Sequence, residues 1–208
     1  MKDNFVSAPK TVFLFNLNKL DTYVIPLIFA QFSKIRYNKE KKKEGDDYLE
    51  LGEVIQTAKP AFVVLGKEGQ GPAEDGTNWV SELWKAVYQD LDELNTFIDK
   101  EAEEADLWGL MSDSKNWLEP WQEQGKYLAG IELPADIQVP EGWQSWEMPA
   151  MEYLVVKTDA PNLELMTQKM FEEILPGEDY QLVGAIQEHY LPKFAAGEVE
   201  LYFPVKFL

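Results

Sequence analysis

Residues 199–205 read Val-Glu-Leu-Tyr-Phe-Pro-Val, and this alternation of polar and apolar side chains decides the fold class. Successive side chains of an extended strand point to opposite faces, so Leu201 and Phe203 share one face while Glu200 and Tyr202 share the other. We predict a strand that packs its apolar face against helices. Glu200 and Tyr202 would then point into a groove.

The segment before this strand, residues 180–191, shows a similar pattern. Glu188 and Tyr190 fall on one face of a strand and His189 on the other. Two carboxylates with tyrosines beside them on adjacent strands would make an acidic pocket with aromatic walls. The alternative is a solvent-exposed strand face, where Glu and Tyr are also common.

The second half of the chain begins with one further strand and a helix. Residues 148–158 alternate enough to predict the strand. Asp159 or Asn162 can cap a helix that ends at Pro176-Gly177. With the two strands already described, this half reads strand, helix, strand, strand.

The first half has the same order of elements. We expect a strand over residues 61–66 and a loop over residues 67–76. Asn78 is a plausible cap for a helix that runs to about residue 104, with apolar side chains at steps of three and four. Strands are expected over residues 106–112 and 126–133. A tandem repeat of such units packs its helices on one side and leaves the other faces able to meet in a groove.

The composition is that of a globular, acidic protein. The chain has 208 residues, 27 of them aromatic, and a net charge of −18. Residues 1–43 carry 9 Lys/Arg against 3 Asp/Glu, and residues 44–208 carry 10 against 34. We therefore predict a basic N-terminal appendage over residues 1–58, with a short helix at residues 46–56, followed by an acidic domain over residues 59–208.

This charge and the scarcity of certain residues exclude several functions. A phosphate backbone is bound mostly through Lys and Arg, so direct nucleic-acid binding is not expected and cationic ligands are favoured. The chain has no Cys and one His, so disulfides, Cys-ligated zinc and multi-His metal sites are excluded. We predict neither a cofactor nor a bound metal.

The apolar runs near the N-terminus do not predict a membrane span. Residues 11–17 and 23–32 are apolar, but Asn16, Asp21 and Pro26 are among the residues that interrupt the stretch. A spanning helix needs about 20 largely unbroken apolar residues. The expected location is the cytoplasm.

Five segments together resemble one known family. They are Pro60–Gly66, Trp79–Trp84, Lys126–Pro134, Gly142–Tyr153 and, above all, Glu200-Leu201-Tyr202-Phe203-Pro204-Val205-Lys206. They look like the GyrI-like small-molecule-binding domain, which is also the effector-binding half of AraC-type and MerR-type multidrug regulators. The resemblance covers residues 59–208 and implies a stand-alone member.

The resemblance implies an α+β fold and a ligand site. Two pseudo-twofold strand-helix-strand-strand units would form a curved antiparallel sheet, with helices on one side and a ligand cleft on the other. Family glutamates in aromatic pockets meet cationic, lipophilic ligands, and Glu188 or Glu200 could be the central one. The expected ligand-binding residues are Glu188, Tyr190, Glu200, Tyr202, Tyr153, Trp143, Trp146, Trp117, Trp121 and Trp108, whereas Trp84 and Trp79 are expected to pack in the core.

Three functions remain open at this point. The first is a stand-alone binding module for lipophilic, cationic small molecules. The second, implied by the resemblance, is hydrolysis of strained cyclopropane-containing genotoxins, with Glu188, Glu200 and Tyr202 as candidate catalytic residues. The third is a protein-interaction role such as gyrase inhibition. The glycine-rich residues 66–71 lack the order of a phosphate-binding loop, and His189 is expected to be an ordinary strand histidine.

Overall fold

The computed structural model of the chain describes residues 49–208 apart from residues 91–92, 94–105, 134–137, 178 and 192–196. Within these residues, nine strands form one antiparallel sheet in the order β1-β6-β9-β8-β3-β4-β2-β5, with β7 beside β9. The strands are β1 (Val54–Lys59), β2 (Phe62–Pro72), β3 (Leu107–Asp113), β4 (Gln124–Leu133), β5 (Gln144–Met148), β6 (Met151–Asp159), β7 (Tyr180–Leu182), β8 (Gln187–Tyr190) and β9 (Glu198–Phe207). The helices are α2 (Gly76–Gln89) and α4 (Leu163–Lys169), which continues through a π-helical turn (Met170–Ile174) into α5 (Leu175–Gly177).

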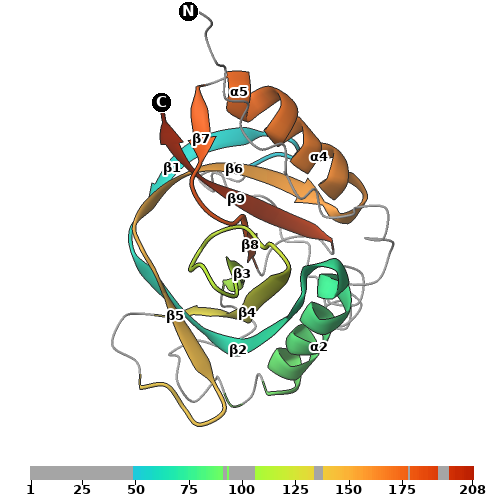
Figure 1. Ribbon diagram of the computed structural model, residues 1–208, viewed down its shortest axis with the longest axis vertical. Coiled ribbons are helices and arrows are strands. Elements are labelled where there is room, and N and C mark those ends of the chain that lie inside the picture. The colour runs from blue at the N-terminus through green and yellow to red at the C-terminus, as the bar shows by residue number, and fades with distance from the viewer. Residues whose placement is uncertain (1–48, 91–92, 94–105, 134–137, 178, 192–196) are drawn as a thin grey trace, which may run out of the picture.

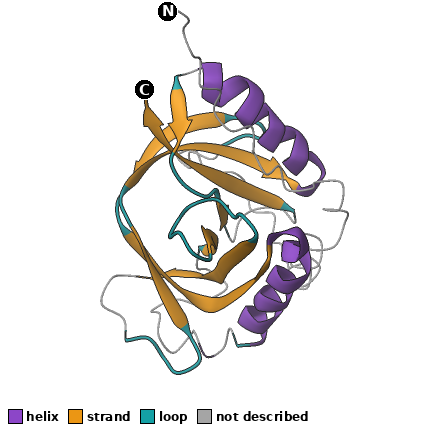
Figure 2. Cartoon of the chain, in the orientation of Figure 1, coloured by secondary structure: helices purple, strands orange, loops and turns teal. Residues whose placement is uncertain are grey.

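The predicted fold class is confirmed. Both helices lie on one face of a curved antiparallel sheet, which we call the helix face (Figures 1 and 2). The elements β2-α2-β3-β4 and β6-α4-β8-β9 repeat the same order, and in the sheet the two halves meet where β8 pairs with β3. We call this β8–β3 pairing the seam.

The outermost strands are exchanged between the two halves. β1 precedes β2 in the chain but pairs with β6, and β5 precedes β6 but pairs with β2. Two residues connect each exchanged strand to the next strand of the chain, Pro60-Ala61 between β1 and β2 and Pro149-Ala150 between β5 and β6. Because each half supplies an edge strand to the other, the two halves form one continuous sheet.

The helices are amphipathic, as the sequence predicts. On α2, Val80, Trp84 and Val87 are buried at steps of three and four residues. α2 begins at Gly76, two residues earlier than the expected cap at Asn78. In the second half, the Asp159 side chain accepts a hydrogen bond from the backbone N–H of Asn162, which satisfies an N–H at the start of the helical segment.

The expectation of a helix over residues 46–56 is wrong for residues 49–56, none of which is helical. Residues 54–59 form β1, whose backbone pairs with β6 along its whole length. Val54, Ile55 and Thr57 are β-branched and favour a strand. This strand places residues 54–58 in the sheet with the domain that we expected to begin at residue 59, and residues 46–48 lie outside the described part.

The expectation of a loop over residues 67–76 is also wrong for most of its length. β2 continues to Pro72, with β4 paired to it throughout. A Cβ at Gly69 would lie 2.9 Å from the Leu83 side chain, and one at Gly71 would lie 2.6 Å from the Trp79 ring. The glycines therefore let α2 lie close on an extended strand. The helix was predicted to run to residue 104, but beyond Asp90 only Glu93 of that range is among the described residues.

The face opposite the helices, which we call the opposite face, holds a second hydrophobic cluster. Its buried members are Phe62, Val64, Trp108, Leu110, Leu118, Leu128, Trp146 and Met148. The sheet curves toward this side, so Lys59 on β1 reaches Glu132 on β4 although these strands are far apart in the strand order. The groove expected on this face from the sequence is thus filled by packed side chains at these positions.

Candidate functional site

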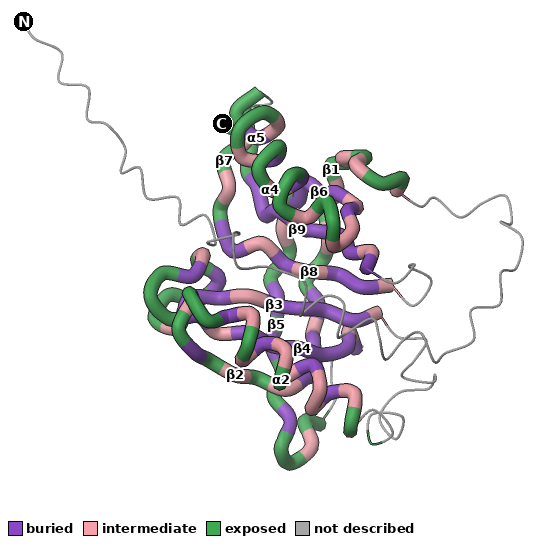
Figure 3. Tube along the Cα trace, turned by 90° about the vertical axis from the view of Figure 1, so that its right-hand side faces the viewer, coloured by how far each residue is buried: buried purple, intermediate pink, exposed green. Residues whose placement is uncertain are grey.

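Glu188 lies at the centre of the helix face. α2 packs on β2 and β4, whereas α4 packs on β6, so β9, β8 and β3 lie between the two helices in the strand order. Figure 3 views this side and shows β8 and β3 between α4 and α2. Glu188 is the third-last residue of β8 and remains partly exposed, although both of its neighbours on the strand are buried.

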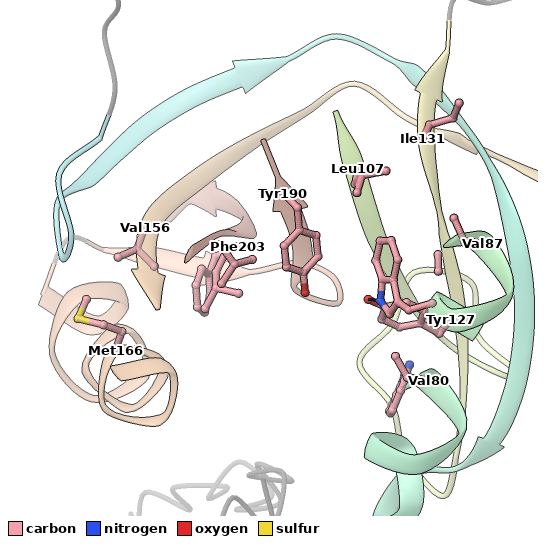
Figure 4. Close-up of a cluster of buried hydrophobic side chains, with 14 of the residues drawn as sticks. Val80, Val87, Leu107, Tyr127, Ile131, Val156, Met166, Tyr190 and Phe203 are labelled. Carbon is pink, nitrogen blue, oxygen red and sulfur yellow. Dashed lines mark hydrogen bonds between the residues drawn. The ribbon is translucent and has the colours of Figure 1, made fainter. Parts of the chain in front are cut away.

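Three aromatic side chains surround this carboxylate. The Tyr127 hydroxyl donates a hydrogen bond to Glu188 Oε2 at 2.6 Å, and Trp84 Nε1 donates to Tyr127 Oη at 3.1 Å. The Tyr190 ring stands edge-on to Trp84, with the centroids 5.5 Å apart. Figure 4 shows Tyr190 and Tyr127 on the sheet between α4, which carries Met166, and α2, which carries Val80. We call Glu188, Tyr127, Tyr190 and Trp84 the Glu188 centre.

Gly109 makes room for the Glu188 centre. It is the Cα partner of Glu188 across the seam. A Cβ at this position would overlap Tyr127 Oη and lie 2.6 Å from Glu188 Oε2. A side chain on β3 here would therefore occupy the space in which the hydroxyl meets the carboxylate.

Burial sets the protonation of the Glu188 centre. Desolvation raises the pKa of Glu188, and hydrogen bonds from Tyr127 and Tyr190 offset only part of that rise. Desolvation and the nearby Glu188 also raise the pKa of both tyrosines, so their hydroxyls stay protonated as donors. The salt bridges found among the described residues do not include Glu188. The centre can therefore take up a cation or a proton.

Glu200 lies on the opposite face and has a different environment. Glu200 Oε2 is 2.9 Å from Nδ1 of His189, and the Tyr202 hydroxyl donates to the same oxygen at 3.4 Å. The His189 ring stacks on Trp108, with centroids 4.2 Å apart. Nε2 of His189 is 3.5 Å from Asp106 Oδ2. Glu200 is thus already paired with the only histidine of the chain.

The two carboxylates do not converge, which corrects the expectation of a single acidic pocket. In the β8–β9 register, Glu188 pairs with Leu201 and His189 pairs with Glu200. Directly paired residues point to the same face of a sheet. Glu188 therefore shares a face with the apolar side chains of β9, and Glu200 points to the other side.

The remaining candidates are divided between the two faces. Tyr190 belongs to the Glu188 centre, and Trp143 and Trp121 pack in the core cluster of the helix face. Trp108, Trp146, Tyr202 and Tyr153 belong to the opposite face, where Tyr153 contacts Tyr202 edge-on and Trp117, 51% exposed, stands against Trp146. The ten candidates therefore do not line one site.

Sequence reasoning missed Tyr127 and assigned Trp84 to the core. Trp84 is indeed fully buried in the helix-face cluster, and it also donates to the tyrosine that holds Glu188. The available signal for Tyr127 was its position between Gly125 and the small residues Ala129 and Gly130 on β4, where a polar aromatic on the apolar face needs a hydrogen-bond partner.

Two expected absences can be compared only with the part of the chain that the structure describes. None of the helices found there combines the length and apolar character that a membrane crossing requires. Among the same residues, no group of three or more His, Asp or Glu side chains is arranged to hold a metal ion.

The chain belongs to the GyrI-like small molecule binding domain family, whose model matches residues 53–206. The chain is 26% identical over 155 residues to the transcriptional regulator BrlR of Pseudomonas aeruginosa. That match covers 71% of this chain and 53% of BrlR, so the chain spans about half the length of that relative.

Solved structures share the fold at low sequence identity. SAV2435 bound to tetraphenylphosphonium superposes with a TM-score of 0.53 at 14% identity, covering 74% of this chain and 94% of that chain. The EcmrR C-terminal domain superposes with a TM-score of 0.51 at 15% identity, covering 76% of this chain and all of that domain. These likenesses support the fold assignment.

Proposed function

We propose that this domain binds lipophilic monocations on the helix face, with Glu188 as the counter-charge. The supporting observation is a partly exposed carboxylate set among Tyr127, Tyr190 and Trp84 that is absent from the salt bridges of the described residues. A desolvated carboxylate is costly unless a cation or hydrogen bonds compensate it. Aromatic faces attract the same cations.

Glu188 is favoured over Glu200 because of their partners. Glu200 is 8% exposed and lies beside His189, which supplies a positive charge when it is protonated. An added cation beside Glu200 would have to displace or repel that imidazolium. Glu188 receives hydroxyl hydrogen bonds from Tyr127 and Tyr190, which bring no positive charge, so its ionised form has a charge for a ligand to neutralise.

The ligand class is supported by one structural relative. SAV2435 is bound to tetraphenylphosphonium, a lipophilic monocation without N–H donors. The Glu188 centre suits such a guest because two tyrosine hydroxyls already occupy hydrogen-bonding positions of the carboxylate. Long-range charge attraction and ring contact would then provide the affinity.

The proposal is tested by titrating the protein with tetraphenylphosphonium and with neutral triphenylphosphine oxide. Calorimetry is used because fluorescence quenching would not show which of the seven tryptophans responds to the ligand. We expect the cation to bind with a Kd on the order of micromolar, about −8 kcal/mol, and the neutral compound to bind at least roughly tenfold more weakly. Equal affinities would contradict a role for the carboxylate charge.

Cation binding is expected to strengthen as the pH rises. The pKa of Glu188 is raised, so below that pKa the carboxyl is neutral and a cation gains little from it. Affinity should therefore increase as the pH rises through that pKa, and binding should release a proton in that range. Calorimetry in two buffers of different ionisation enthalpy measures the released proton, and a flat pH profile in this acid-to-neutral range would contradict the proposal.

A second candidate is hydrolysis of a strained electrophile at the same centre. The observation that favours it is the raised pKa of Glu188 next to hydroxyl donors, which is typical of a general acid or base. In ring opening, the water oxygen would bond to one cyclopropane carbon, the strained C–C bond would break, and the proton would go to the other carbon. Glu200 and Tyr202 lie on the opposite face and would not take part together with Glu188.

Mass spectrometry distinguishes hydrolysis from binding. A panel of cyclopropane-containing substrates would be incubated with the protein and followed for addition of one water. One general acid or base typically contributes ~10²–10⁴-fold, so Glu188→Gln should reduce turnover by at least about a hundredfold. If no substrate of the panel gains water, binding remains the better account of the centre.

A further inference from the structure

His189 and Glu188 are adjacent on the seam strand but face opposite sides of the sheet. β8 has only four residues, and three of them pair with β3 and three with β9. A short strand at the junction of two halves has few backbone contacts to hold it. The side chains on its opposite face therefore contribute much of its anchoring.

Two anchors lie on that face, one on each side of Glu188. The Gln187 side chain accepts from the backbone N–H of Met111 at 2.6 Å and donates to the Met111 carbonyl at 3.2 Å, which ties β8 to β3. The His189 ring ties β8 to β9 through Glu200 and to β3 by stacking on Trp108. Gln187 is neutral, whereas the His189 anchor depends on charge.

Charged and titratable groups approach His189 from several elements. Glu200 and Tyr202 face it from β9, and Asp106 lies beside it just before β3. Behind Trp108, the indole Nε1 donates to Glu132 at 2.8 Å, and Glu132 is ion-paired with Lys59 at 3.0 Å. The ring therefore lies between two carboxylates, and an imidazolium is the form that satisfies both.

We infer that His189 is a positioning residue for Glu188: as an imidazolium held by Glu200 and Asp106, it fixes the seam so that Glu188 meets Tyr127 and the bound cation on the other face. This inference rests on the proposed function. A binding group must be held within roughly 0.5 Å of its productive position, so loosening β8 from β9 would weaken cation binding without touching the ligand.

The protonation behaviour of the ring agrees with this role. Burial lowers the pKa of His189, but the hydrogen bonds and charges of Asp106 and Glu200 outweigh burial and raise it. The imidazolium pair is therefore complete below the ordinary histidine pKa and is lost as the pH rises through the raised value. Cation affinity should then show two limbs, rising with pH as Glu188 ionises and falling at higher pH as His189 loses its proton.

The sharpest test uses the fact that His189 is the only histidine of the chain. Its ring resonances can be titrated by NMR without assignment, with and without saturating tetraphenylphosphonium. Simple repulsion between the bound cation and the imidazolium would lower the His189 pKa. Positioning predicts the reverse, since a ligand that binds better to the protonated protein must raise that pKa by linkage. A lowered or unchanged midpoint overturns the inference.

Variants provide a second test. His189→Gln should weaken tetraphenylphosphonium binding by about tenfold at neutral pH, within the usual range of coupling energies. Because this change leaves Glu200 buried without its cation, the double variant His189→Gln/Glu200→Gln supplies a neutral amide pair that preserves packing. The double variant should lose the alkaline limb of the pH profile and keep the acid limb. An alkaline limb that persists in the folded double variant overturns the inference.

A matched control and the logic of failure separate this inference from the proposed function. Lys85 and Glu82 form an exposed ion pair on α2, the helix that packs on β2 and β4. Lys85→Gln/Glu82→Gln removes one positive and one negative charge, as the double variant at His189 and Glu200 does, and should leave affinity and both pH limbs unchanged. If the cation binds through Glu188 but the His189 midpoint does not rise, only the positioning role fails. If Glu188→Gln has no effect on tetraphenylphosphonium binding, the proposed function itself fails.

Discussion

Replacing Glu188 with Gln should weaken tetraphenylphosphonium binding by about a hundredfold, close to 2.7 kcal/mol. Gln keeps the shape and an acceptor for the Tyr127 hydroxyl, so the packing of the Glu188 centre is retained. The lost charge removes the counter-ion of the ligand, and deleting one partner of a desolvated charge pair typically costs ~2–5 kcal/mol. Calorimetric titration of both proteins measures the change.

Glu152→Gln is the control for this substitution. Glu152 is an exposed carboxylate on β6, and its place in the alternation puts it on the helix face too. Its removal changes the net charge of the protein by the same amount as Glu188→Gln. Affinity should fall for Glu188→Gln and stay within about twofold for Glu152→Gln. Equal losses in the two variants would mean that the general acidity of the protein, and not the Glu188 centre, attracts the cation.

Gly109→Ala should be the most damaging single-methyl change in the site. The new Cβ would overlap Tyr127 Oη and lie 2.6 Å from Glu188 Oε2. Tyr127 and Leu128 are buried and β3 is paired on both sides, so the strands have little freedom to move apart. We expect a loss of about 1–3 kcal/mol in the free energy of unfolding and a loss of cation affinity together. Urea unfolding and calorimetry measure the two effects.

Two further variants show whether the Gly109 effect comes from the site. Gly177→Ala adds a methyl group where nothing lies within 4 Å of the new Cβ, and it should change neither quantity. Tyr127→Phe combined with Gly109→Ala removes the hydroxyl that the methyl group meets first, so stability should partly recover while affinity stays low. If Gly109→Ala is as stable and binds the cation as tightly as the native protein, the close packing at the seam contributes neither to stability nor to cation binding.

The alternation of residues 199–205 predicted side-chain faces correctly but not which carboxylates meet. Leu201 and Phe203 are in the helix-face core as expected, and His189 does lie on the face opposite Glu188. Whether Glu188 shares a face with Glu200 depends on the register between β8 and β9. A shift of one residue in that register would place the two carboxylates on the same face, and no local sequence pattern indicates the register.

The elements of the fold were predictable where local signals were strong. The helix stripe of Val80, Trp84 and Val87 and the repeated strand-helix-strand-strand order both appear in the sequence. The exchange of β1 and β5 between the halves was not predictable, because each pairs with a strand of the other half. The strand predicted over residues 61–66 is shorter than β2, which continues to Pro72. Gly69 and Gly71 look like turn residues until the helix packed against them is known.

The central claim is that Glu188 on the helix face, and not Glu200 on the opposite face, receives the ligand charge. Determining the structure of the protein with tetraphenylphosphonium tests it most directly. We predict the cation between α2 and α4, with its centre within roughly 6 Å of the Trp84 or Tyr190 ring and beside the Glu188 carboxylate. A cation found beside Glu200 and Tyr202, or bound away from both carboxylates, would contradict the account.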